Sequence, residues 1–120
     1  MADILVIDDE ALFRDLLSQV LGGMGHSITT AEDGTQGVEA ALQSIPDLVI
    51  TDMSMPGMTG WDVIRTLKAD PATTDVPIIA LTAHSSQEDR IEGYEAGCDA
   101  FVAKPLDMPQ LLKQVDTILS

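Results

Sequence analysis

Residues 48–52 read Leu48-Val49-Ile50-Thr51-Asp52, an apolar run that ends on an acid and leads into the loop 53–57. A short apolar run bounded by turn residues is typical of a strand buried on both faces of a sheet. A carboxylate at the end of such a strand is costly to desolvate unless a cation or hydrogen-bond donors meet it. This stretch therefore predicts a central strand and, at its end, a functional acid.

Three more apolar runs, at residues 4–7, 77–81 and 100–103, are also followed directly by polar residues. The polar side chains at or just after their ends are Asp8, Asp9, Thr82 and Lys104. Three acids, one hydroxyl and one lysine, all at strand ends, indicate a site rather than a requirement of the fold.

Amphipathic stretches alternate with these runs. We expect a weaker strand near 27–31, and helices near 10–21 and 35–44 and after Thr59, Ser85 and Asp107. Five βα units in succession predict an α/β fold with a parallel sheet covered on both faces. The expected arrangement is a flavodoxin-like, doubly wound, five-stranded parallel sheet of order 2-1-3-4-5 with five helices, in one domain spanning residues 1–120.

Finer expectations concern where the helices begin, end and face. Gly22-Gly23 is expected to stop the first helix, and the second to turn Val38, Ala41 and Leu42 inward. Thr59 and Asp107 are expected to cap later helices, and Ser85 with Glu88 forms a capping-box pattern.

Composition excludes several classes of function. The chain has 120 residues, 45% of them apolar, and a net charge of −14. Direct nucleic-acid binding is disfavoured because no basic cluster is present, and anionic membranes are disfavoured for the same reason. There is no signal-peptide pattern and no run of 18 apolar residues, so no membrane insertion is expected. Cys98 is the single cysteine, and together these features predict a cytoplasmic protein.

The predicted topology brings the acids together. In this strand order the first and third strands are neighbours at the topological switch point, where ligands bind beyond the carboxyl ends. Adjacent strands lie about 4.8 Å apart, so Asp8, Asp9 and Asp52 are expected to be close. Two such charges about 4 Å apart repel by roughly 4 kcal/mol near a protein surface. Oxygen ligands without a nearby His or Cys favour a hard cation, and Mg²⁺ is the physiological choice.

Thr82 and Lys104 directly follow the next two strands of the predicted sheet. Both side chains are therefore expected at the same carboxyl edge of the sheet as the acids. The set then contains an acid pair that organises a metal, a lone carboxylate, a hydroxyl donor and an ammonium. Such a set suits a carboxylate nucleophile that takes a phosphoryl group, with the cations and the hydroxyl balancing charge on the phosphoryl oxygens.

Four segments carry a family resemblance, in order and across nearly the whole chain. They resemble the motifs of bacterial two-component response-regulator receiver domains, CheY-like in form and here in a single-domain chain. The segments are Val6-Ile7-Asp8-Asp9-Glu10, Thr51-Asp52-Met53-Ser54-Met55-Pro56-Gly57-Met58-Thr59-Gly60, Ala80-Leu81-Thr82-Ala83 and Phe101-Val102-Ala103-Lys104-Pro105.

The resemblance implies a role for each matching residue. Asp52 would accept a phosphoryl group from the phosphohistidine of a histidine kinase or a histidine phosphotransfer protein. Asp9, Asp52 and the backbone carbonyl of Ser54 would ligate Mg²⁺, with Asp8 acting mainly through bound water. Lys104 would pair with the phosphoryl oxygens.

The remaining implied roles concern switching and lifetime. Thr82 and Phe101 would form the conformational switch, and Ser54 and His84 would adjust the phosphoryl lifetime. The Lys104-Pro105 bond is expected to be cis, which an X-Pro bond allows at modest intrinsic cost.

The chain would transmit its signal by binding another protein. The surface made by the helix after Ser85, the strand 100–103 and the last helix would change shape and engage a downstream protein partner. The polar helix after Ser85 has few apolar anchors, as expected of a movable element. The chain would not be an enzyme beyond catalysing its own phosphorylation and dephosphorylation, and would be a monomer or a weak phosphorylation-dependent dimer. A stand-alone receiver, a phosphorelay intermediate and a receiver excised from a larger regulator all remain open.

Each candidate residue also has a plainer interpretation. Asp8 and Asp9 could cap the first helix, Asp52 could be a turn residue, and Thr82 could be a cap. Lys104 could be a solvated lysine, and Phe101 a core side chain.

Three other classes of protein compete with a signalling receiver. A haloacid-dehalogenase-type hydrolase would need an Asp-x-Asp pattern and a cap domain, a flavin-binding module would need a phosphate cradle after the first strand, and a pseudo-receiver would lack the intact acid set.

Overall fold

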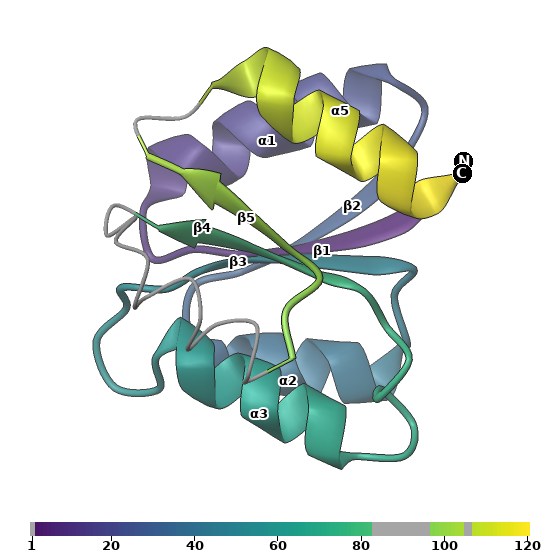
Figure 1. The fold of residues 1–120 in the computed structure, drawn as a ribbon. Helices are drawn as coiled ribbons and strands as arrows, with labels where there is room; N and C mark the ends of the chain where they lie inside the picture. Colours follow the sequence, from purple (N-terminus) through teal and green to yellow (C-terminus); the bar gives the residue numbers. More distant parts are fainter. Residues whose placement is uncertain (1, 83–96, 105–106) are drawn as a thin grey trace.

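The computed structural model describes residues 2–82, 97–104 and 107–120. Within them the chain alternates strands and helices from end to end (Figure 1). In chain order the elements are β1 (Asp3–Ile7), α1 (Ala11–Gly23), β2 (Ser27–Ala31), α2 (Gly34–Gln43), β3 (Leu48–Asp52), α3 (Gly60–Ala69), β4 (Ile78–Thr82), β5 (Ala100–Ala103) and α5 (Met108–Leu119). The helix expected after Ser85 falls outside the described residues.

The five strands form one parallel sheet in the order β2-β1-β3-β4-β5. The predicted fold class and strand order are therefore confirmed. In the register, Ile7 lies opposite Thr51, Asp52 opposite Leu81, and Thr82 opposite Ala103. Consequently the carboxyl ends of β1, β3, β4 and β5 meet at one edge of the sheet.

Helices cover both faces of the sheet. Figure 1 shows α1 and α5 on one side and α2 and α3 on the other. Alternate residues of each strand serve the two cores, as the two-residue period of a strand requires. Leu5 and Ile7 pack with α2 and α3, whereas Ile4 and Val6 pack with α1 and α5. Strands β3 and β4 are buried along their whole length, which explains their continuous apolar sequence.

Side-chain caps fix the starts of three helices. Thr59 begins α3 with a reciprocal capping box to Asp62, and Asp107 accepts from the backbone N–H of Gln110 at the start of α5. Both predicted caps are confirmed. Asp33 caps α2 by accepting from the backbone N–H of Gln36.

One finer prediction is confirmed and one is wrong. The first helix stops at its glycine pair, because α1 ends at Gly23. The second helix buries Val38 and Ala41 as expected, but Leu42 is 44% exposed. The cause is that α2 buries a narrow stripe at Gly34, Gly37, Val38 and Ala41, which leaves the next position facing solvent.

Gly60 lets α3 start directly against the end of β3. A Cβ at Gly60 would lie 2.5 Å from the carbonyl oxygen of Asp52 and 2.6 Å from the Cα of Met53. Real Cβ contacts of that length essentially do not occur, so a side chain there would force the loop after Asp52 to move. The absence of a side chain at Gly60 therefore helps to set the position of Asp52.

Candidate functional site

Two buried carboxylates and one exposed one converge at the carboxyl ends of β1 and β3. Asp8 is fully buried and Asp52 is 4% exposed. Asp9, the next residue after Asp8, is exposed to solvent. The structure thus separates two adjacent acids that the sequence treats alike: Asp8 faces the protein and Asp9 faces outward.

Lys104 lies between the two buried acids. Its Nζ is 3.5 Å from Oδ2 of Asp8 and 3.3 Å from Oδ1 of Asp52, and its side chain is 13% exposed. The backbone N–H of Lys104 donates to the carbonyl of Thr82 at 2.8 Å, which continues the pairing of β5 with β4. The pairing of β5 with β4 therefore places the ammonium of Lys104 beside the two acids. The interpretation of Lys104 as a solvated lysine is wrong.

The aromatic ring of Phe13 completes the surroundings of the ammonium. The Nζ of Lys104 lies 4.2 Å from the centroid of this ring. A cation over the face of a ring is attracted by the negative charge of that face. Phe13 therefore helps to hold Lys104 over the acids from the first turn of α1.

Backbone and side-chain donors hold Asp8 in place. Its Oδ1 accepts from the backbone N–H of Glu10 at 2.9 Å. Its carbonyl accepts from Nη1 of Arg14 at 2.7 Å, and its own N–H donates to the carbonyl of Ala31 at 3.1 Å. Asp8 is thus fixed from β2, from the connecting turn and from α1.

The carboxylate of Asp52 accepts a longer backbone hydrogen bond than that of Asp8. Its Oδ1 accepts a long, 3.5 Å hydrogen bond from the backbone N–H of Ser54. The following residue continues the sheet, because the N–H of Met53 donates to the carbonyl of Leu81 at 3.0 Å. Ser54 itself is exposed.

Burial raises the pKa of both inner acids above the ordinary value. For Asp8 the largest cause is loss of hydration, opposed by the N–H of Glu10 and reinforced by the charge of Asp52. For Asp52 the largest cause is again burial, opposed mainly by Lys104. One ammonium does not balance the charge of two buried carboxylates. A further cation would therefore stabilise the ionised form of the cluster.

The donor set fits a hard cation. Oxygens of Asp8, Asp9 and Glu10 lie within 4.8 Å of one another in the described part of the chain. All three are carboxylates, the ligand type that Mg²⁺ prefers. Glu10 was not among the predicted metal ligands. Its position directly after Asp9 could have indicated that its carboxylate lies near the other two.

Thr82 and Phe101 lie on the neighbouring strands β4 and β5, with Phe101 opposite Ala80, two residues before Thr82. Thr82, the last residue of β4, is 2% exposed. Phe101 is 7% exposed and belongs to the core beside α3, with its ring centroid 6.2 Å from that of Trp61. The interpretation of Phe101 as a core residue is confirmed, and its role as a switch remains a prediction.

Two predicted residues fall outside the described part of the chain, namely His84 and Pro105. The lifetime role of His84 and the cis bond between Lys104 and Pro105 therefore stay predictions. The sequence reasoning missed Phe13 and Arg14. Both residues lie in the first turn of the helix that follows the acid pair, and this position could have indicated that they are close to the site.

Comparison with known proteins identifies the family. A model described as "Response regulator receiver domain" matches residues 4–116. The chain belongs to the response-regulator receiver family.

Similar proteins with solved structures share the whole receiver fold. The chemotaxis protein CheY4 of Vibrio cholerae superposes with a TM-score of 0.94 at 31% identity, covering 99% of both chains. A putative response regulator from Chloroflexus aurantiacus superposes with a TM-score of 0.92 at 30% identity, covering 98% of this chain and 97% of that one.

Curated relatives are longer than this receiver domain. The "DNA-binding dual master transcriptional regulator RpaA" of Synechocystis is 36% identical over 119 residues, which is 99% of this chain and 49% of RpaA. The "Response regulator PleD" of Caulobacter vibrioides is 38% identical over 117 residues, 98% of this chain and 26% of PleD.

Membership of this family makes the chain a regulatory domain of two-component signal transduction. The described residues contain no helix that is both long enough and apolar enough to cross a membrane.

Proposed function

We propose that this receiver domain is a phosphorylation-dependent switch and that Asp52 is its phosphoacceptor. The observation that carries the proposal is the ammonium of Lys104 within 3.5 Å of both buried acids, at the topological switch point of the sheet. Of the two acids, the carboxylate of Asp52 accepts the longer backbone hydrogen bond, 3.5 Å against 2.9 Å for Asp8, and the exposed Ser54 follows it in the loop. Asp8 is buried too, but its N–H, its carbonyl and its carboxylate each have a hydrogen-bond partner.

The reaction is a phosphoryl transfer to a carboxylate. An Oδ atom of Asp52 attacks the phosphorus of a phosphohistidine, so that an O–P bond forms as the P–N bond breaks. The bond pair stays with the departing imidazole. Dephosphorylation reverses the acceptor chemistry, because water attacks phosphorus and the P–O bond breaks to return the carboxylate and inorganic phosphate. The domain catalyses only these reactions on itself.

Mg²⁺ would be held by Asp9, Asp52 and the backbone carbonyl of Ser54, with Asp8 acting mainly through bound water. When bound, the ion supplies positive charge that offsets the repulsion between the acids and the phosphoryl oxygens. Lys104 supplies the second cation, since its Nζ already lies 3.3 Å from Asp52. Its ammonium then donates to a phosphoryl oxygen.

Thr82 and Phe101 change position in response to the new charge. The phosphoryl group carries about 1.5 to 2 negative charges, which replace the single charge of the carboxylate. The Thr82 hydroxyl moves toward it and donates to an oxygen, and Phe101 fills the space that opens. The surface formed by the helix after Ser85, β5 and α5 then changes and engages a downstream protein. Beryllofluoride with Mg²⁺ tests this step, and unchanged amide resonances across residues 85–104 would contradict it.

Other residues tune the signal. By resemblance to the family, Ser54 and His84 are the residues that adjust the lifetime of the phosphoryl group. We place the phosphodonor, a histidine kinase or a histidine phosphotransfer protein, in the cytoplasm. The single cysteine, Cys98, is unpaired, as is usual in a reducing compartment. The acidic charge of the chain fits a protein partner and not nucleic acid.

Acetyl phosphate with Mg²⁺, followed by intact-mass measurement, tests the proposed acceptor. The wild-type chain is expected to gain the mass of one phosphoryl group, and Asp52→Asn to gain none. Asp116→Asn, at an exposed position on α5, removes the same charge and is expected to label like wild type. Equal labelling of the Asp52→Asn chain, or no labelling of wild type, would overturn the proposal.

A further inference from the structure

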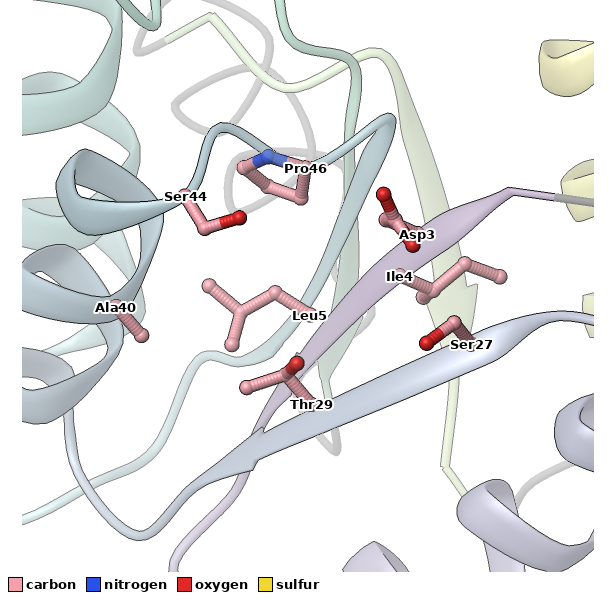
Figure 2. A pocket seen from close by; sticks show the side chains of 8 residues that line it. All are labelled: Asp3, Ile4, Leu5, Ser27, Thr29, Ala40, Ser44 and Pro46. Carbon is pink, nitrogen blue, oxygen red and sulfur yellow. The ribbon is translucent and has the colours of Figure 1, made fainter.

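A cavity lies at the end of the sheet opposite to Asp52. It has a volume of about 210 Å³ and opens between the first residues of β1 and β2 and the end of α2 (Figure 2). Strand residues rise about 3.3 Å each, so Asp3 in the cavity wall is about 16 Å from Asp8 in the phosphorylation site. The cavity therefore belongs to a separate surface.

The cavity wall combines one acid and several hydroxyls with an apolar floor. Asp3, Ser27 and Thr29 line its strand side, and Leu5 forms part of the floor (Figure 2). No lysine or arginine is among the lining residues. A second acid is adjacent, because the N–H of Asp3 donates to Oδ2 of Asp47 at 2.8 Å. This wall is complementary to a cation with an apolar stem.

The size of the cavity limits its occupant. Sites for drug-sized ligands measure about 300–1,000 Å³, so this cavity is suited to a single long side chain. Lysine and arginine carry a cationic head on an apolar stem. A stem would pack on Leu5 and Pro46, and the head would reach Asp3.

The open edge of the sheet passes beside the cavity. β2 is the outermost strand at this side of the described sheet. The N–H of Ser27 donates to the carbonyl of Ala2, and the carbonyl of Ala31 accepts from Asp8. Because successive residues of a strand direct their backbone groups to alternate sides, those of Ile28 and Thr30 point away from β1. This edge can accept another strand.

One exposed apolar residue is next to the cavity lining in the chain. Ile45 is 45% exposed. It lies in sequence between the lining residues Ser44 and Pro46.

We propose that the β2 edge and this cavity together bind an extended peptide segment of a partner protein, which pairs with β2 and inserts a lysine or arginine beside Asp3. Extended segments commonly bind by adding a strand to an open edge, with pockets reading alternate side chains. The net charge of −14 favours a basic segment. Binding here leaves the acceptor site at the other end accessible.

A peptide titration tests the proposal. The probe is acetyl-Thr-Val-Arg-Val-Thr-amide, added to the ¹⁵N-labelled chain at low salt and followed by amide chemical shifts. Shifts are expected in β2 and around the cavity. Replacement of the arginine by citrulline, which has nearly the same shape without the charge, is expected to weaken binding about fivefold, as for an exposed ion pair.

Variants separate the two parts of the site. Asp3→Asn should remove the preference for arginine over citrulline, whereas Asp15→Asn, an exposed acid on α1, should retain it. Thr30→Pro removes an outward N–H and should weaken both peptides, whereas Thr30→Ala should not. Circular dichroism confirms that each variant is folded.

Three outcomes would overturn the proposal. The first is equal affinity for the arginine and citrulline peptides. The second is an unchanged preference in Asp3→Asn. The third is binding of acetyl-arginine-amide as tightly as the pentapeptide, which would indicate a small-molecule cation site instead of a strand-binding one. The third comparison uses only the wild-type chain, so it holds even if Thr30→Pro fails to fold.

Discussion

Among the described residues, two lysines pair with aspartates, and the surroundings of the two ammonium groups differ. Lys68 lies at the amino end of the sheet, 3.4 Å from Asp99, with the two side chains 20% and 43% exposed. Its Nζ also donates to the carbonyls of Val76 at 2.8 Å and Thr74 at 3.3 Å. Lys68 is therefore a structural lysine that meets one acid and two neutral acceptors.

Lys104, at the carboxyl end, meets two nearly buried carboxylates instead. Burial of uncompensated charge opposes folding. This cost fits our proposal that the two acids are retained for what they bind or accept. The comparison therefore contrasts a lysine that meets one acid and two neutral acceptors with one that meets two buried acids at the proposed site.

The largest expected effect is on Lys104 itself. Lys104→Met leaves Asp8 and Asp52 without their cation and is expected to lower the free energy of unfolding by about 3–5 kcal/mol at neutral pH. Lys68→Met breaks a partly exposed pair and is expected to lower it by about 1 kcal/mol. Urea denaturation of both variants measures the difference. Equal losses would remove the distinction between the two lysines.

A smaller effect is expected at the close approach of α3 to β3. Gly60→Ala places a Cβ against the carbonyl of Asp52 and is expected to lower the free energy of unfolding by about 1–3 kcal/mol. Gly22→Ala, in α1, meets nothing within 4 Å and is expected to raise it by about 0.5–1 kcal/mol. Thermal denaturation distinguishes the two signs. A stabilising Gly60→Ala would show that the loop after Asp52 is not constrained by this contact.

Mg²⁺ should stabilise the carboxyl end selectively. At ten times its dissociation constant, the ion is expected to raise the free energy of unfolding of the wild-type chain by about 1.4 kcal/mol. Asp9→Asn removes an exposed carboxylate that we propose as a ligand, without disturbing the core, and should reduce this gain. Asp15→Asn, also exposed, should keep it. Denaturation with Mg²⁺ or with EDTA gives the comparison, and an unreduced gain in Asp9→Asn would exclude Asp9 as a ligand.

The smallest expected effect is the pH dependence of stability without metal. Burial raises the pKa of Asp52 above the ordinary value of 3.8, so the folded chain binds the proton more tightly than the unfolded chain. Stability is therefore lost as pH rises through the window between 3.8 and the raised pKa, and the loss is complete above that window.

Replacement of Asp52 by asparagine removes that titration. Asp52→Asn is expected to be more stable than wild type at neutral pH in EDTA, and the advantage should shrink as the pH falls toward 3.8. Asp116→Asn, at an exposed position, should show no such trend. Urea denaturation across this pH range supplies the measurement. An advantage that grows toward low pH would mean that the pKa is lowered and not raised.

The strands were the most predictable part of the fold. Residues 48–51 and 100–103 are continuous apolar runs because both faces of the sheet are covered, and the structure has strands at Leu48–Asp52 and Ala100–Ala103. Helix faces were less predictable. Leu42 continues an apolar pattern yet is exposed, because the width of the buried stripe of α2 depends on how α2 packs against the sheet.

The site was predictable in its members but not in its contacts. Strand order alone brought Asp8, Asp52 and Lys104 together. The sequence could not show that Asp8 turns inward and Asp9 outward, because this depends on the direction of the backbone after β1. Nor could it show Phe13 under the ammonium, since that contact joins residues 91 positions apart through α1 and β5.

Localisation of the phosphoryl group tests the central claim most directly. After incubation with acetyl phosphate and Mg²⁺, reduction with borohydride converts an aspartyl phosphate to homoserine, and tandem mass spectrometry of the digested chain finds its position. We predict homoserine at position 52 alone. Homoserine at position 8 or 9, or at no position in a chain that has gained a phosphoryl group, would contradict the assignment of Asp52 as the acceptor.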